Sequence, residues 1–338
     1  MMDFREFLKA FGETYAPAMR FDGRSSEECR AWQDRFLATL ERLSGDALGV
    51  RRRRHDAPPV APRVTLLDRA EEPDHVRERI AIESVLGTTV PAYVLVPKSP
   101  AAGPRPGVLA LHGHTPRGKA KVAGVSEPGG YGLAAVRAGY VTLCPDWWGF
   151  GERLETGFDF EGQDACNVKF VAAAMYGLPL LTLMLHDAQA ALDVLLARPD
   201  VDPRRVAVIG NSFGGRMSMY LAAFDERLAG AACSGCLNCF RERSLNLTSC
   251  GAQFFPGLLR FGDVEDLFAL IAPRPLLILT GRADPLIPHE WAERMKPVIR
   301  RAYDAFGAAD RLTFHDHPGP HVLPLPPLLA WLARLFSR

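Results

Sequence analysis

The chain has 338 residues, 48% of them hydrophobic, and a formal net charge of +1. This composition is ordinary for a globular protein, and the nearly balanced charge gives no reason to expect a polyanionic partner such as a nucleic acid. The length allows either two domains or one large α/β fold, and both could bury a sizeable core.

Residues 1–60 are predicted to form a helical extension that ends in a linker. Apolar side chains recur at helical spacing at Phe4, Phe7, Leu8 and Phe11. The same spacing recurs at Trp32, Phe36, Leu37, Leu40 and Leu43. The basic run Arg51–Arg54 then leads into a proline-rich stretch. We interpret this run as part of a solvated linker, and nucleic-acid binding is the alternative.

Nothing in the sequence predicts export or membrane insertion. The N-terminus lacks the uninterrupted apolar region of a signal peptide, and no run of 18 apolar residues offers a membrane span. The chain has seven cysteines, and without an export signal we expect their thiols to be reduced. We therefore expect a cytoplasmic protein without a membrane partner.

Residues 61–338 are expected to form one catalytic domain built on a mostly parallel sheet. His75–Ser84 and Thr89–Val96 flank Gly87 as two antiparallel strands would. Apolar runs without alternation follow, which is typical of buried parallel strands. These runs are Gly107–Leu111, Tyr140–Cys144, Arg205–Ile209, Gly230–Cys233, Leu276–Thr280 and Leu312–His315. Helical segments such as Leu180–Ala197 alternate with them, so the sequence predicts an α/β fold with a doubly wound sheet and helices on both faces.

Two connections between these strands are too long to be simple loops. Residues 145–179 and 234–267 both follow the carboxyl ends of predicted parallel strands, the edge where ligands bind in open α/β sheets. Their aromatic residues are Trp147, Trp148, Phe158, Phe160, Phe170, Tyr176, Phe254, Phe255 and Phe261. We expect these insertions to form a cap. Trp147 and Trp148 either wall a substrate pocket or pack within the cap.

The strongest local signal is a Gly-x-Ser-x-Gly motif centred on Ser212. A predicted strand precedes it, and Met217–Ala223 after it is typical of a helix. On a turn this tight, side chains at positions 210 and 214 would clash, and both positions hold glycine. The start of the following helix would point free N–H groups at a developing oxyanion. Ser212 is therefore the predicted nucleophile.

A serine nucleophile needs a base and a third group that orients the base, and in this architecture the acid precedes the histidine along the chain. Asp284 follows the predicted strand Leu276–Thr280 at its carboxyl end and is the predicted acid. Its alternative role is that of an Asp-Pro turn residue. Asp310 and Asp316, which flank the last strand, are the other carboxylates in reach of this edge.

Three histidines near the C-terminus compete for the role of general base. His315 belongs to the last predicted strand and His317 lies at its end. His321 follows a Pro-Gly-Pro turn, where a loop can place it over the sheet edge. We assign the base to His321 and keep the other two as alternatives.

The oxyanion hole is predicted to use the backbone N–H groups of Phe213 and His114, since His114 lies in the loop after the strand Gly107–Leu111. His112 with His114 could instead be a metal pair, but no third ligand is evident. The Cys-x-x-Cys at Cys236 and Cys239, with Cys233 before it and Cys250 after it, also lacks a second ligand pair. We therefore expect no metal and treat these cysteines as small buried or lid residues.

A resemblance to a known family rests on four segments: Leu111–His114, Pro145–Arg153, Asp202–Gly215 and Ala272–Asp284. Together they resemble the dienelactone-hydrolase and acetyl-xylan-esterase-like branch of the α/β-hydrolases, over about residues 75–335. The resemblance implies the α/β-hydrolase fold and ester hydrolysis through an acyl-enzyme without a cofactor. It also implies a triad of Ser212, Asp284 and His321, with His114 as the second oxyanion donor. True dienelactone hydrolases have cysteine in place of Ser212, which argues against that substrate.

The sequence thus predicts a serine hydrolase that cleaves a carboxylic ester of a small or medium soluble substrate, without interfacial activation. A peptidase or amidase of the prolyl-oligopeptidase type is an alternative, although no propeller-like region precedes the core. A thioesterase or an acyltransferase is another, because the same triad serves any acyl acceptor. An inactive α/β-hydrolase that only binds a ligand is the alternative of a different class. A homo-oligomer is compatible with all of these.

Overall fold

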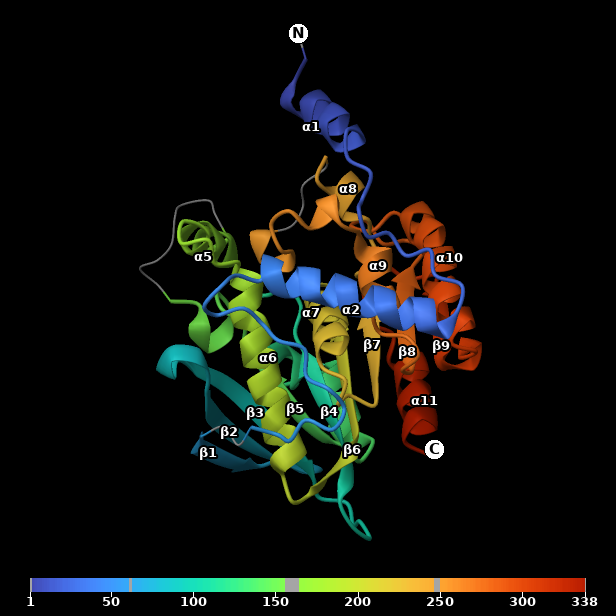
Figure 1. Ribbon diagram of the computed structural model, residues 1–338. Coiled ribbons are helices and arrows are strands. Elements are labelled where there is room, and N and C mark those ends of the chain that lie inside the picture. The colour runs from blue at the N-terminus through green and yellow to red at the C-terminus, as the bar shows by residue number, and fades with distance from the viewer. Residues whose placement is uncertain (1, 61–62, 156–163, 246–249, 338) are drawn as a thin grey trace.

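The computed structural model describes residues 2–60, 63–155, 164–245 and 250–337, and it contains one nine-stranded sheet (Figure 1). The order across the sheet is β1-β2-β3-β5-β4-β6-β7-β8-β9. The strands are β1 (Val64–Glu71), β2 (His75–Glu83), β3 (Thr89–Pro97), β4 (Arg105–Leu111), β5 (Val141–Pro145), β6 (Val201–Asn211), β7 (Gly230–Ser234), β8 (Leu276–Gly281) and β9 (Leu312–His317).

The sheet has an antiparallel part and a parallel part. Strands β1, β2, β3 and β5 pair antiparallel, with the β2–β3 pair in the arrangement expected from the sequence. From β5 through β4, β6, β7 and β8 to β9, every neighbouring pair is parallel. Strand β1 was not predicted. It is an edge strand with almost every residue exposed and a register shift between Leu66 and Asp68, so it carries no buried periodicity.

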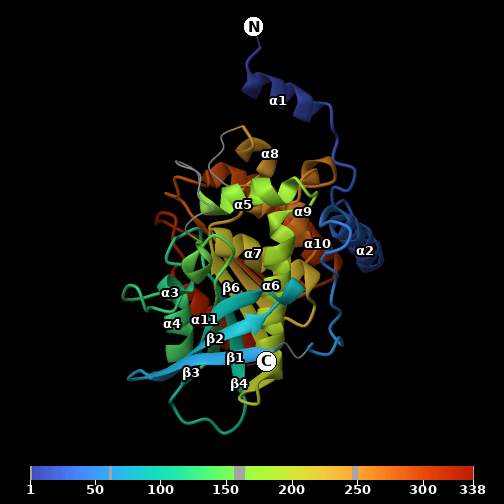
Figure 2. The same ribbon diagram turned by 90° about the vertical axis from the view of Figure 1, so that its left-hand side faces the viewer.

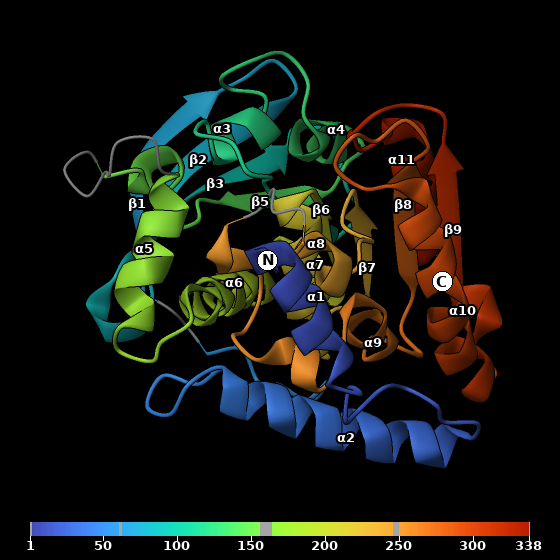
Figure 3. The same ribbon diagram turned by 90° about the horizontal axis from the view of Figure 1, so that it is seen from above.

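The central parts of the parallel strands are apolar, since helices cover both faces of the sheet. In β6, Val206 and Val208 belong to one core, whereas Ala207 and Ile209 belong to the other. Side chains alternate in the same way along β4 and β8. The first core packs against α2 (Ser26–Leu43), α6 (Leu180–Ala197), α7 (Phe213–Phe224), α9 (Val264–Ala269) and α10 (His289–Ala305). The second packs against α3 (Lys119–Val122), α4 (Tyr131–Arg137) and α11 (Leu325–Phe336). Figures 2 and 3 show these helices beside the sheet.

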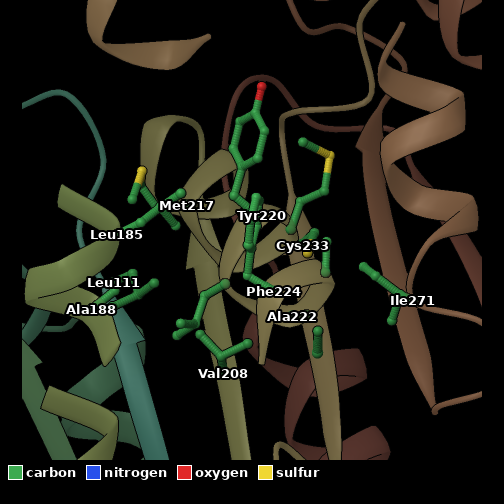
Figure 4. Close-up of a cluster of buried hydrophobic side chains, with 14 of the residues drawn as sticks. Leu111, Leu185, Ala188, Val208, Met217, Tyr220, Ala222, Phe224, Cys233 and Ile271 are labelled. Carbon is green, nitrogen blue, oxygen red and sulfur yellow. The ribbon is translucent and has the colours of Figure 1, made fainter. Parts of the chain in front are cut away.

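The first core holds the largest buried side chains beside the predicted nucleophile turn. Figure 4 shows Met217, Tyr220 and Phe224 from α7 near Leu111 of β4 and Val208 of β6. All five side chains are fully buried. Burial of such side chains stabilises a domain by about 1.5–3 kcal/mol each. Helix α7, which follows the predicted nucleophile, is therefore packed firmly against the sheet.

Helix α6 is the one helix of the described chain that is long and apolar enough to cross a membrane by length and composition alone. Its 18 residues have a mean hydropathy of 1.4, and 78% of them are buried inside the protein. It contains Asp187 and Asp193, which pair with Arg153 and Arg227 respectively. This burial is that of a core helix.

The N-terminal region contains the two predicted helices, and they differ in packing. Helix α1 (Phe4–Glu13) has no buried residue and stands away from the rest of the chain in both Figure 1 and Figure 2. In contrast, α2 buries Trp32, Phe36 and Leu40 in the first core, and the Gln33 amide donates to three carbonyl oxygens between residues 269 and 272.

Both predicted insertions carry short helices at the same end of the molecule (Figure 1). The segment 145–179 contains α5 (Ala165–Ala174), and 234–267 contains α8 (Phe240–Arg243), two 3₁₀ turns and the start of α9. The Gly251 N–H donates to the Asn167 side chain, so the two insertions contact each other. Phe158 and Phe160 lie outside the described residues.

Candidate active site

Ser212 lies on the turn between β6 and α7 with φ 60° and ψ −121°, a backbone conformation that is strained for any residue but glycine. A Cβ at Gly210 would overlap the backbone of Gly214, and a Cβ at Gly214 would overlap the carbonyl of Leu111. The predicted reason for both glycines is therefore confirmed. The Ser212 N–H donates to the Ser234 carbonyl oxygen at 2.8 Å, which ties the turn to the end of β7.

Asp284 and His321 form the predicted pair. The distance from His321 Nδ1 to Asp284 Oδ2 is 2.6 Å, and the aspartate side chain is 1% exposed. The other carboxylate oxygen, Oδ1, accepts the N–H groups of Leu286 and Ile287 at 2.8 and 3.2 Å. These donors fix the carboxylate so that it orients the imidazole. His321 Nε2 is buried and has no hydrogen-bond partner among the described residues, Ser212 included.

The two alternative histidines do not contact this aspartate by any hydrogen bond in the described chain. His317 is 7% exposed at the end of β9, where its ring lies against Gly281 and Gly319. Burial, with a smaller effect from His315, lowers the pKa of His317 below its ordinary value. Asp316 is paired with Lys296 at 2.7 Å, so it is engaged elsewhere.

The loop after β4 brings His112, Gly113 and His114 to the nucleophile turn. The Gly113 α-carbon lies so close that a Cβ there would be 3.1 Å from the Asn211 carbonyl oxygen and 3.5 Å from Ser212 Cβ. His112 uses both ring nitrogens: Nδ1–H donates to the Gly113 carbonyl at 2.7 Å, and Nε2 accepts the Trp147 N–H at 3.2 Å. Burial lowers the pKa of His112 to about 4, so this ring is neutral and structural.

A cavity of about 420 Å³ adjoins Ser212 and His321. Its lining combines backbone of the β4 loop with polar side chains, and the hydroxyl of Tyr131 in the wall donates to the Leu111 carbonyl oxygen. The described lining residues are Gly113, His114, Thr115, Lys121, Val122, Glu127, Gly130, Tyr131, Asn211, Ser212, His321, Val322, Leu323 and Leu325. A space of this size with mixed polarity suits a small or medium ligand.

Trp147 and Trp148 are not among the residues that line this cavity, which favours packing, the second of their two predicted roles. Trp147 is fully buried, its indole N–H donates to the His112 carbonyl at 3.3 Å, and its ring packs edge-on against Phe213. Trp148 lies under the Arg153 guanidinium, 3.6 Å from the ring centroid. The Trp147 ring therefore supports the β4 loop and the nucleophile turn, whereas Trp148 packs at the edge of the first core.

The aromatic residues of the insertions pack mainly against one another. Phe170 lies 6.0 Å from Phe254 between ring centroids, and Phe254 lies 6.0 Å from Phe240. Phe255 is fully buried against Tyr220 and Phe224 of α7. These contacts join the two insertions over α7, next to the catalytic edge.

The cysteines do not behave as one cluster. Cys233 and Cys236 lie together beside Arg216, and the Cys239 thiol donates to Asp263 at 3.0 Å. Cys250 instead meets Cys166 of α5 and His114 of the β4 loop. Hydrogen bonds from Cys166 and His114 lower the pKa of the Cys250 thiol, and the shared proton raises the pKa of Cys166. Cys166 was not singled out in the sequence, because it has no neighbouring cysteine or histidine in the chain.

Comparison with known proteins agrees with this architecture. Residues 90–306 match the dienelactone hydrolase family. A protein of Bacillus subtilis (strain 168) named "Putative hydrolase YtaP" is 30% identical over 264 residues, which cover 75% of this chain and 85% of that protein.

Two solved structures share the fold. One is the structure of "a putative acetyl xylan esterase" from Bacteroides fragilis NCTC 9343. Its TM-score is 0.79 at 17% sequence identity, and the alignment covers 100% of this chain and 96% of that protein. The other is a glucuronoyl esterase from Solibacter usitatus. Its TM-score is 0.68 at 17% sequence identity, and the alignment covers 95% of this chain and 97% of that protein. The chain therefore belongs to the dienelactone hydrolase family and is a hydrolase with the α/β-hydrolase fold.

Proposed function

We propose that the chain is a serine esterase that cleaves carboxylic esters of small or medium soluble substrates through an acyl-enzyme. The observation that carries this proposal is the combination of Ser212 on its strained turn with the Asp284–His321 pair. Ser212 and His321 line the same cavity, and His321 Nε2 has no hydrogen-bond partner among the described residues. A general base with an unused ring nitrogen beside a serine on a sharp strand-to-helix turn is the arrangement that acyl transfer requires.

In the proposed reaction, His321 Nε2 accepts the proton of the Ser212 hydroxyl as Oγ attacks the ester carbonyl carbon. The carbonyl oxygen becomes an oxyanion, which the N–H of Phe213 at the first position of α7 stabilises together with the N–H of His114. The imidazolium then protonates the departing alcohol, and Asp284 holds the ring in the required tautomer. Water, activated by the same imidazole, attacks the acyl-enzyme and releases the acid.

The size of the cavity supports a limit on substrate size. About 420 Å³ is enough for a short acyl chain with a modest alcohol. Three polar side chains of the lining, Thr115, Lys121 and Glu127, and the names of the two structural neighbours favour an ester of a carbohydrate. A thioesterase or amidase would use the same triad and is separated from an esterase by the assay below.

The first test is the variant Ser212→Ala, assayed for ester hydrolysis beside the wild type. Loss of the nucleophile should reduce kcat by roughly 10⁴–10⁶ and leave the melting temperature nearly unchanged, since only a hydroxyl is removed. A folded Ser212→Ala preparation that keeps more than a few per cent of the activity would contradict the proposal.

The second test defines the substrate class. We expect kcat/KM to be highest for p-nitrophenyl acetate or butyrate, lower for octanoate and lowest for palmitate, with an acetylated xylo-oligosaccharide also cleaved. Casein and a thioester of the same acyl group serve as controls for peptidase and thioesterase activity. A maximum at palmitate, or ready cleavage of casein, would contradict the proposed limit on size and class.

A further inference from the structure

A second group of reactive side chains lies beside the candidate active site, and the esterase mechanism does not use it. His114 comes from the loop after β4, Cys166 from α5 in the first insertion, and Cys250 from the position just before the 3₁₀ turn Gly251–Gln253 in the second. Their ligand atoms all lie within 4.8 Å of one another. Three segments that are far apart in the sequence thus place one imidazole and two thiols at a single point.

The geometry points to a zinc site: we propose that His114 Nε2, Cys166 Sγ and Cys250 Sγ bind one Zn²⁺ ion. Zinc prefers thiolate sulfur and imidazole nitrogen in tetrahedral sites, and Cys₂His with an open fourth position is an established ligand set. With zinc–sulfur bonds of about 2.3 Å and a zinc–nitrogen bond of about 2.0 Å, such ligand atoms lie roughly 3.5–3.8 Å apart. The distance from His114 Nε2 to Cys166 Sγ is 3.1 Å, so small shifts suffice.

The surroundings of the three ligands fit a built site. Cys166 and Cys250 are 1% and 4% exposed, so their thiols are protected from bulk solvent. The His114 ring packs edge-on against Phe150 at 4.9 Å between centroids, which holds Nε2 on the side of the sulfurs. Asp164 Oδ2 lies 3.7 Å from His114 Nε2 and is a described carboxylate that could take the fourth position.

This assignment departs from the expectation of no metal, because that expectation considered the wrong pairs. Both ring nitrogens of His112 are hydrogen-bonded to backbone groups, and the Cys239 thiol donates to Asp263. One other group in the described chain has metal-ligand spacing, namely His289, Glu293 and Asp316. There the Lys296 ammonium group already contacts both carboxylates, which leaves no need for a cation.

The proposed ion would join both insertions to the loop that holds the second oxyanion donor. The side chain of His114 would bind zinc, while its backbone N–H remains directed by the loop beside Ser212. The role of the ion is therefore structural. It holds the two insertions and the His114 backbone in place and does not contact the ester. The metal site does not depend on the proposed esterase function, since zinc binding can be measured without turnover.

The experiment measures zinc binding to the purified full chain, kept reduced and first stripped of metal by a chelator. We expect one equivalent of Zn²⁺ to bind with release of thiol protons, and one equivalent of Co²⁺ to give the thiolate-to-cobalt absorption and visible bands of a tetrahedral site. Competition with a chromophoric chelator should show that Cys166→Ser and Cys250→Ser each weaken zinc binding by more than about 100-fold, because even the loss of an outer partner costs 10–100-fold.

Cys29→Ala is the matched control, since Cys29 is equally buried but lies in α2 far from this junction in the chain. It should bind zinc as the wild type does. Circular dichroism establishes that each variant is folded, and the cobalt spectrum of the wild type tests the site even if a variant unfolds. Failure of the reduced wild type to bind one equivalent would overturn the proposal, as would unchanged zinc affinity in folded Cys166→Ser or a Cys166–Cys250 disulfide in protein purified without oxygen.

Discussion

The turn that carries Ser212 and the junction where His114 meets Cys166 and Cys250 lie side by side, yet different forces hold them. The turn is held by backbone crowding: Gly210 and Gly214 have no room for a Cβ, and Ser212 takes a left-handed conformation. The junction is held by side chains from three segments, each of which could move independently. Crowding fixes a geometry within a few residues, whereas side-chain convergence requires the whole fold.

This difference decides what each region tolerates. At the turn, any added atom collides with the backbone, so substitutions should affect folding as well as chemistry. At the junction, the ligands can be replaced without a collision. The effect should be confined to metal binding and to how firmly the two insertions are held. The following predictions test this contrast, beginning with the largest effect.

The largest effect should come from replacing the general base. His321→Ala should lower kcat by roughly 10⁴–10⁶, because the serine loses its proton acceptor, while His317→Ala should retain most activity and lose stability. Steady-state kinetics and thermal unfolding of both variants make the comparison. Normal activity in His321→Ala together with a dead but folded His317→Ala would reverse the assignment.

The second largest effect should come from Asp284→Asn, which should lower kcat roughly 10⁴-fold at neutral pH. The amide can donate to His321 Nδ1 and thereby stabilise the wrong tautomer, although its shape still fits the pocket. Asp310→Asn is the matched control, since Asp310 also lies near the last strand. Similar activity in the two variants would mean that Asp284 has only a structural role.

The crowding at the turn predicts a large cost for a single methyl group. Gly214→Ala should lower the free energy of unfolding by roughly 2–4 kcal/mol, because its Cβ would overlap the Leu111 carbonyl oxygen. Gly12→Ala is the control: a Cβ there meets nothing within 4 Å, and the change should be below about 1 kcal/mol. Chemical denaturation measures the free energy of unfolding of both variants. Equal values for Gly214→Ala and Gly12→Ala would contradict the proposed crowding at the turn.

Much of this contrast could be predicted from the sequence, since the turn is a local motif. The glycines, Ser212 and the strand before it lie within about ten residues, and the apolar runs of the parallel strands indicate which strand ends share an edge. That is why Asp284 and His321, both after strand ends, were found. The role of Trp147 and Trp148 stayed open between pocket wall and packing, because position after a strand does not reveal which side of the loop a ring takes.

The junction could not be predicted, because none of its ligands stands beside another in the chain. Cys166 has no partner in its own segment, and its contact with His114 spans 52 positions. Strand β1 was missed for a related reason: an exposed edge strand has no buried face to produce alternation. Both cases depend on how distant segments pack, which local patterns do not encode.

The smallest expected effect is a change in acid stability. The pKa of His317 is below its ordinary value of 6.5 in the folded chain, chiefly because burial disfavours the charged ring. Its contribution to stability is therefore present above pH 6.5 and is lost as the pH falls toward the folded pKa. His317→Gln should flatten the decline in the free energy of unfolding below pH 6.5. His55→Gln should not, since His55 is exposed, and equal slopes in both variants would contradict this origin.

The central claim, that Ser212 is an activated nucleophile, is tested most directly by mapping the site of a fluorophosphonate label on the intact protein. The account predicts one label per chain on the peptide that contains Ser212, and labelling slowed by orders of magnitude in His321→Ala, because the hydroxyl then lacks its base. A label on another residue, or an unlabelled Ser212 in protein that still hydrolyses esters, would contradict the account.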